Sequence, residues 1–163
     1  MIQRVSLQDD FQVLAKLLND SFGTVAVDFG LTIENCATNS AFITSEELKS
    51  QLAENREFYS YNNGVAFVGF IAIERSLGEI GTYYIEKVSV HPDFRHAGIG
   101  EELMRFAESR IEKLGGSRIS IALIDSNTIL KKWYLKQGFT VTETKIYEHL
   151  PFDVCFMEKY YEV

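Results

Sequence analysis

The sequence has little cysteine and little proline, with two residues of each among its 163. Cys36 and Cys155 form neither a disulfide framework nor the spacing of a metal site. A chain of this length does not need a disulfide scaffold, so a reduced, intracellular setting is the simpler expectation. No segment rich in Pro, Gly or Ser interrupts the chain as a linker, and we expect a single domain over 1–163.

Positive charge is also scarce. Sixteen basic residues stand against 23 acidic ones, for a net charge of −7. Nucleic acids and anionic membrane surfaces require a basic field, so neither is an expected partner. No apolar run approaches the roughly 18–20 residues of a membrane span. The first five residues lack the features of a signal peptide, and we expect a cytoplasmic protein.

What the chain does contain is apolar and aromatic residues, 46% and 13% of the total, which is enough to fill a core. Residues 23–42 show no clear hydrophobic periodicity. The alternatives for this segment are a binding loop and a short helix with a weak sequence signal. Periodicity, capping-box spacings and turn signals elsewhere predict strands near 2–5, 56–61, 65–73, 79–90, 118–124, 139–147 and 152–160, and helices near 6–19, from 44 onward, 98–114 and 127–137.

The alternation of strands and helices in the second half predicts parallel pairing at the centre of the sheet, and the hairpins elsewhere predict antiparallel pairing. We therefore expect an α/β fold with a single mixed sheet and helices on both faces.

The sharpest local signal lies between Val88 and Glu101. A strand ends, a tight turn follows, and Gly98 and Gly100 open a long amphipathic helix. Unpaired N–H groups at a helix start form an anion site, and glycine lets a phosphate approach the backbone. Arg95 adds a cation that is suited to a diphosphate. The pattern is neither the dinucleotide fingerprint nor a P-loop; a helix start that prefers small residues is the alternative.

Three segments together resemble the GCN5-related N-acetyltransferase (GNAT) superfamily. Arg95–Gly100 matches the Arg/Gln-x-x-Gly-x-Gly signature of that family. The segment 84–92 is similar to its central fourth strand. The pattern Asn127-x-x-Leu130-x-x-x-Tyr134-x-x-x-Gly138-Phe139 is similar to its second motif, with Leu130 where the family usually has Ala.

The resemblance implies a mostly antiparallel, twisted sheet of about seven strands whose central parallel strands splay apart to admit acetyl-CoA as cosubstrate, with no metal. Backbone groups of Val88 and Val90 are then expected to bond the pantetheine amides. Asn127 is expected to contact the pantetheine arm, with a plain helix N-cap as the alternative. The residues expected to cradle the pyrophosphate, chiefly through main-chain N–H groups, are Arg95, His96, Ala97, Gly98, Ile99 and Gly100.

Acetyl transfer to an amine requires a deprotonated nucleophile, a stabilised oxyanion and a proton for the leaving thiolate. Tyr134 matches the family tyrosine that protonates the sulfur; a packing aromatic is the alternative. Glu86, on the central strand just before the pantetheine contacts, is the candidate base, and a solvated or paired carboxylate is its alternative. A backbone N–H near Val88 is the expected oxyanion donor.

The class of acceptor is inferred from the distribution of charge alone. The net charge is −5 over 1–62 and −2 over the remainder. We hypothesise a cationic amine attracted by Asp28 and Glu34, with an ordinary solvated acidic surface as the alternative.

The expected function is therefore an acetyl-CoA-dependent N-acetyltransferase, which moves an acetyl group to a primary amine of a small molecule or peptide by direct attack in a ternary complex. A non-catalytic acyl-CoA-binding sensor or interaction module is the competing function. A homodimer through the C-terminal strands is left open.

Overall fold

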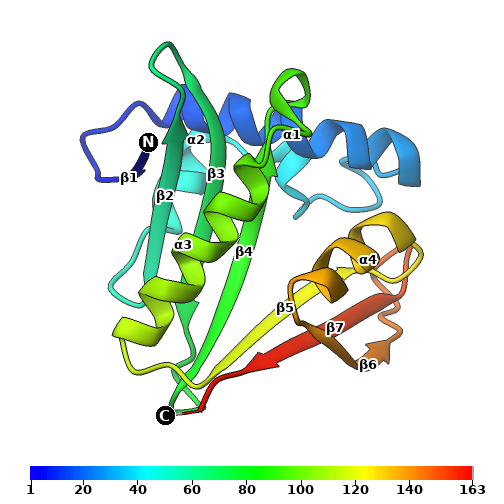
Figure 1. The fold of residues 1–163 in the computed structure, drawn as a ribbon. Coiled ribbons are helices and arrows are strands. Elements are labelled where there is room, and N and C mark those ends of the chain that lie inside the picture. The colour runs from blue at the N-terminus through cyan, green and yellow to red at the C-terminus, as the bar shows by residue number, and fades with distance from the viewer. Residues whose placement is uncertain (163) are drawn as a thin grey trace.

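The computed structural model describes residues 1–162, which build one mixed sheet in the strand order β1-β2-β3-β4-β5-β7-β6 (Figure 1). Within this range all neighbouring strands are antiparallel except β4 and β5, which confirms the expected fold class. The strands are β1 (Ile2–Arg4), β2 (Arg56–Asn62), β3 (Phe67–Arg75), β4 (Thr82–Val90), β5 (Arg118–Ile124), β6 (Thr140–Lys145) and β7 (Val154–Tyr160). The helices are α1 (Phe11–Phe29), α2 (Ser45–Ser50), α3 (Ile99–Lys113) and α4 (Thr128–Lys136), with short 3-10 helices η1 (Ser40–Phe42) and η2 (Pro92–Phe94).

The first helix differs from the expectation at both ends. Ser6 and Asp9 close a local turn, and the N-cap is Asp10, whose carboxylate accepts the N–H groups of Gln12 and Val13. The helix then continues to Phe29, so the first part of the unassigned segment 23–42 is helical. Its sequence shows no clear period because the C-terminal part of α1 packs against loops as well as the sheet.

Helices cover both faces of the sheet, and the two faces alternate along each strand. Ile71 and Ile73 of β3 belong to the core beneath α3, while Phe70 and Ala72 belong to the core beneath α1 and α2. This alternation follows from the two-residue period of a strand. In Figure 1, α3 lies across one face of β2, β3 and β4, and α1 passes over the end of the sheet on the other.

A third, smaller core joins parts that are distant in the sequence. Ala26 of α1, Leu31 and Cys36 of the following loop, and Ile124 at the end of β5 are buried together, with Leu150 and Phe152 packed against them. Both cysteines are buried free thiols. No helix among residues 1–162 is long and apolar enough to cross a membrane.

The two central strands diverge soon after they meet. β4 and β5 are paired only from Thr82–Tyr84 to Arg118–Ser120, and beyond that point they separate (Figure 1). The expected splay is therefore present. It begins before the place where β4 carries a β-bulge opposite β3, with Ala72 paired to Glu86 but Phe70 paired to Ser89. Bulges bend and twist the strand that contains them.

Candidate active site

The turn before α3 presents unpaired main-chain donors. Gly98 is the N-cap of α3 with a positive φ of 82° and no side-chain cap, whereas α1, α2 and α4 begin with side-chain caps. His96 also has a positive φ, of 65°, and the stretch from His96 to Gly98 is exposed. The first α3 donor to find an acceptor is the N–H of Glu102, which bonds the Gly98 carbonyl at 3.0 Å. The N–H groups before it are free to bind an anion.

Trp133 of α4 shapes this turn from the side. A Cβ added to Gly100 would lie 3.1 Å from the Trp133 ring, so the indole packs directly on the helix start. The Trp133 Nε1–H also donates to Glu101 at 3.3 Å. The indole thus fixes the Glu101 carboxylate beside the unpaired N–H groups at the start of α3. Nothing in the spacing of the sequence indicates this contact.

Arg95 is placed differently from the expectation. Its guanidinium points to α1, where it donates to the Ser21 carbonyl at 2.8 Å and the Thr24 hydroxyl at 3.0 Å. Its Nε–H donates to the Val90 carbonyl at 3.2 Å. Three of its five N–H donors thus bind protein acceptors, and a direct contact of this side chain with the diphosphate stays a prediction. Its main chain remains part of the turn.

The backbone groups of Val90 point away from β3, toward the gap between β4 and β5. The N–H of His91 bonds the Val68 carbonyl of β3 at 2.8 Å, and successive residues of a strand point their backbone groups to opposite sides. Val90 therefore faces away from β3. Its carbonyl, however, already accepts from Arg95 and from the Ser21 hydroxyl, the latter at 3.0 Å. Only the N–H of Val90 is left for the expected pantetheine bond.

Glu86 lies on the face of the sheet that α1 and α2 cover, since it is paired with Ala72. Its carboxylate lies 3.7 Å from Arg56 Nε, and Arg56 in turn holds Glu74 at 2.9 Å. Burial first, and then the neighbouring Glu74 carboxyl, raise the pKa of Glu86 to about 7. A carboxylate with this pKa exchanges protons readily at neutral pH, as a general base must.

Lys87, next to Glu86, is a residue that the sequence gave no reason to select. It occupies the bulge with a φ of 55°, a conformation that L-residues with long side chains rarely adopt. Its ammonium group donates to the Ser40 hydroxyl at 3.2 Å, which ties the bulge to η1. Burial lowers its pKa, and the nearby Glu86 opposes that effect.

Tyr134 is buried against Trp133 and Phe139, with ring centroids 5.0 and 5.8 Å away. Burial raises the pKa of its phenol, which keeps the hydroxyl protonated. A protonated phenol of this kind fits the donor role expected from the sequence.

Asn127 is the N-cap of α4, which is the alternative given above for this residue. Its side-chain oxygen accepts the Leu130 N–H at 3.2 Å. The amide –NH₂ of the same side chain is not required for the cap.

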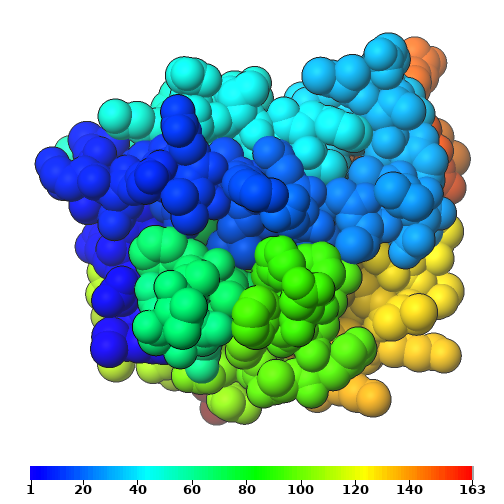
Figure 2. All heavy atoms as spheres, turned by 90° about the horizontal axis from the view of Figure 1, so that it is seen from above, coloured from blue at the N-terminus to red at the C-terminus, as the bar shows by residue number. Residues whose placement is uncertain are grey.

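The two acidic residues that were expected to attract a cationic acceptor lie in different places in the structure. Asp28 lines an open hollow of about 460 Å³ along α1, whereas Glu34 is exposed in the following loop outside that lining. Figure 2 looks down on this end of the molecule, where α1 (blue) crosses the surface beside the green turn around residues 91–98. The hollow is lined by Asn19, Asp20, Gly23, Thr24, Val27 and Asp28.

The structure thus combines an uncapped helix start, a carboxylate with a raised pKa and a buried, protonated phenol in one splayed sheet and its helices. The turn of 95–100 leads into α3 on one face, Glu86 lies on the other face, and the bulge stands between them. No cluster of three His, Cys, Asp or Glu suited to a metal occurs in the described range 1–162.

Comparison with known proteins agrees with this geometry. The family model described as an acetyltransferase (GNAT) domain matches residues 27–158. PaiA N-acetyltransferase from Thermoplasma acidophilum, solved in complex with coenzyme A, superposes with a TM-score of 0.75 at 21% identity, covering 99% of this chain and 98% of that one. Ribosomal-protein-alanine N-acetyltransferase from Brucella melitensis gives 0.74 at 18% identity, with 99% of both chains covered. Aminoglycoside 6'-acetyltransferase type Ii gives 0.72 at 19%, covering 98% and 96%.

Proposed function

The chain belongs to the GNAT family of acetyltransferases, and we propose that it moves the acetyl group of acetyl-CoA to a primary amine of a small molecule or peptide by direct attack in a ternary complex. The observation that carries this proposal is the joint presence of the uncapped start of α3 and a carboxylate with a pKa of about 7 across the splayed strands. A module that only binds acyl-CoA needs the first feature but not the second.

The residues present fit acetyl-CoA. Gly98 has the positive φ that the turn requires, and the N–H groups that follow it have no acceptor within the helix. The N–H of Val90 faces the space between β4 and β5, where an extended pantetheine arm would add like a strand. When bound, acetyl-CoA supplies the thioester carbon that the amine attacks.

The protein's own residues transfer protons and orient the two substrates. Glu86 faces the α1 side of the sheet, so the acceptor approaches from that side and gives its ammonium proton to this carboxylate. The backbone N–H of Val88, at the bulge, donates to the thioester oxygen. Tyr134, held neutral by burial, donates its proton to the departing sulfur.

The acceptor class is proposed to be a cationic amine. Asp20 and Asp28 line the hollow along α1, the helix that covers the face of the sheet on which Glu86 lies. Two of the similar structures are named for acceptors that carry amines, ribosomal-protein alanine and an aminoglycoside. Neutralising Asp28 as Asp28→Asn, with Glu34→Gln as the control outside the hollow, tests this idea. Equal effects of the two variants on KM for a dicationic amine would reject it.

The first test of the proposed function is a thermal shift with acetyl-CoA, free CoA, ATP and NAD side by side. A ligand at a hundred times its Kd stabilises the fold by about 2.7 kcal/mol, which is several degrees for a chain of this size. A rise with acetyl-CoA and CoA alone, followed by thiol release when amines are added, supports the transferase. Binding without thiol release across a broad amine panel would favour the acyl-CoA-binding module instead.

A homodimer remains part of the proposal. β6 is an edge strand of the sheet, and all six of its residues are exposed. An open edge of this kind is a site for strand pairing. Sedimentation equilibrium, with Val141→Lys as the edge variant, tests it: a monomer mass for the unaltered chain would reject the dimer.

A further inference from the structure

We propose that Arg95 is a positioning residue, which fixes the cofactor turn against α1 and so sets the donor in register with the acceptor. This inference rests on the proposed function, because it assigns a role within the same site. It differs from the expected role of the side chain as a diphosphate ligand.

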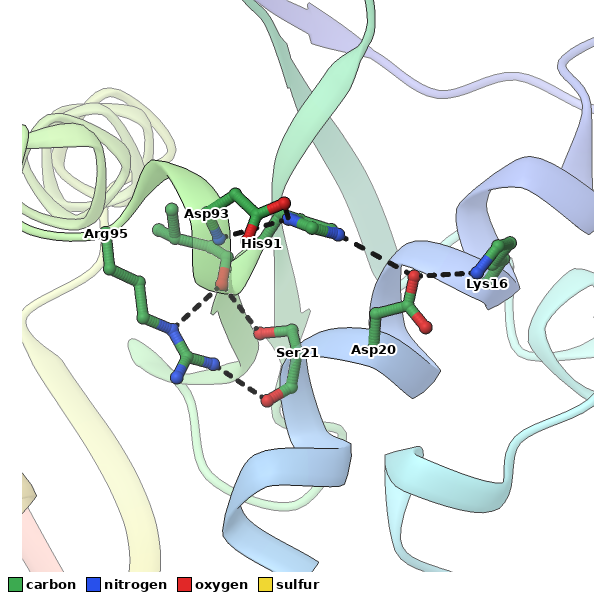
Figure 3. Close-up of polar contacts among 7 residues, drawn as sticks. Lys16, Asp20, Ser21, His91, Asp93 and Arg95 are labelled. Carbon is green, nitrogen blue, oxygen red and sulfur yellow. Dashed lines mark hydrogen bonds and ion pairs between the residues drawn. The ribbon is translucent and has the colours of Figure 1, made fainter.

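The contacts of Arg95 connect three parts of the chain, as Figure 3 shows. Its guanidinium binds the Ser21 carbonyl and the Thr24 hydroxyl, 74 and 71 residues away along the chain. Its Nε–H shares the Val90 carbonyl with the Ser21 hydroxyl. The end of β4, the turn and the middle of α1 therefore meet at one guanidinium group, which presents its donors in a rigid plane.

A second connection runs parallel to the first. The His91 Nε2 lies 3.7 Å from Asp20, and Lys16 holds the same carboxylate at 2.9 Å (Figure 3). The Asp93 N–H donates to His91 Nδ1 at 3.2 Å, which leaves Nε2 to carry the ring proton toward Asp20. The turn is thus tied to α1 at its beginning by His91 and further along by Arg95.

This placement matters because the two substrates approach from opposite faces. The anion site is at the start of α3, which packs on one face of the sheet, while Glu86 lies on the face that α1 and α2 cover. The thioester carbon and the amine nitrogen must come within about 3–3.5 Å, and an error of about 1 Å costs on the order of a hundredfold in rate. The Arg95 network is a direct polar connection between the helix that borders the acceptor and the turn that borders the donor.

The test uses Arg95→Met, which keeps an apolar stem of similar length but removes the guanidinium, and Thr24→Val, which removes only the hydroxyl partner on α1. Thr142→Val is the matched control, since Thr142 lies on the edge strand β6 and its hydroxyl donates to the Phe156 carbonyl of β7 at 3.2 Å. For each variant, kcat, the KM of the amine, the melting temperature and the Kd values of acetyl-CoA and S-acetylpantetheine are measured. The second ligand lacks the diphosphate.

We expect Arg95→Met to lower kcat/KM for the amine by ten- to a hundredfold, while the Kd of acetyl-CoA changes less than threefold. Thr24→Val should give a smaller loss in the same direction. The double variant should be no worse than Arg95→Met alone, because both changes remove one interaction. Thr142→Val should match the unaltered protein.

Two results would overturn the inference. A tenfold weaker Kd for acetyl-CoA with an unchanged Kd for S-acetylpantetheine would show that Arg95 binds the diphosphate after all. Additive losses in the double variant would show that Thr24 acts without Arg95. If Arg95→Met does not fold, Thr24→Val alone decides: an unchanged kcat/KM refutes the coupling. An unaltered protein that binds acetyl-CoA but acetylates no amine would instead contradict the proposed function.

Discussion

Replacing Glu86 by Gln is expected to abolish most activity and, above pH 7, to stabilise the protein. Gln has nearly the same shape but no charge, so the change isolates the carboxylate. That carboxylate is held among Arg56, Glu74 and Lys87 in a setting that disfavours its ionised form, and burial is the largest cause. A carboxyl group whose pKa is raised in this way should lower the stability of the folded protein when it is ionised.

The sign and size follow from the pKa. In the folded protein the pKa of Glu86 rises from 4.5 to about 7, so the folded state holds a proton that the unfolded chain has already lost. Stability therefore falls as the pH rises from about 4.5 to about 7, and the penalty is complete above that. A rise of this size corresponds to at most about 3 kcal/mol. Because the side chain is 33% exposed, we expect a gain of about 1–2 kcal/mol for Glu86→Gln at pH 8.5.

The stability assay is urea unfolding of both proteins at pH 5 and pH 8.5. At pH 5 Glu86 is already protonated, so the difference should nearly vanish there. In parallel, kcat/KM of the unaltered enzyme should rise with pH and level off above about 7. In Glu86→Gln, kcat/KM should fall by about a hundredfold or more, and its rise with pH should disappear.

The reasoning is refuted if Glu86→Gln destabilises the protein equally at both pH values, since the buried charge would then carry no penalty. It is also refuted if the variant retains the same rising limb, since the limb would then report the acceptor amine. Glu74→Gln is the matched control: it removes the adjacent carboxylate and should shift the limb to lower pH without abolishing activity.

Three further predictions follow from single residues. Tyr134→Phe should lower kcat by about a hundredfold while the Kd of acetyl-CoA stays within a factor of three, as measured by single-turnover kinetics and calorimetry; an unchanged kcat would leave Tyr134 as a packing residue. Asn127→Ala should lose about 1 kcal/mol of stability because the cap is lost, whereas Asn127→Asp keeps the cap; if both weaken acetyl-CoA binding alike, the amide contacts the cofactor. Gly98→Ala should weaken acetyl-CoA at least tenfold because the turn needs a φ of 82°, and a normal Kd in titration calorimetry would contradict the cradle.

Local chemistry accounts for what the sequence predicted well. The strand 118–124, the cap at Thr44 and the glycine-led start of α3 all appear where the pattern placed them, because each depends on residues within a few positions of one another. The same reason explains the failure at α1. A helix that packs partly on loops shows a weak period, and the sequence offered Ser6 as a cap where the folded chain uses Asp10.

By itself, then, the sequence determined the mixed α/β sheet, the family and the residues 95–100 as the turn to inspect, since these rest on short-range periodicity and on a contiguous motif. Only the tertiary structure decided what those residues meet. Strand register places Glu74 and Arg56 beside Glu86 and so raises its pKa, and the bulge puts Lys87 into a conformation that its side chain gives no reason to expect. The folded chain likewise turns Arg95 to α1, more than 70 residues away, because a guanidinium bonds whichever carbonyls the fold brings within reach.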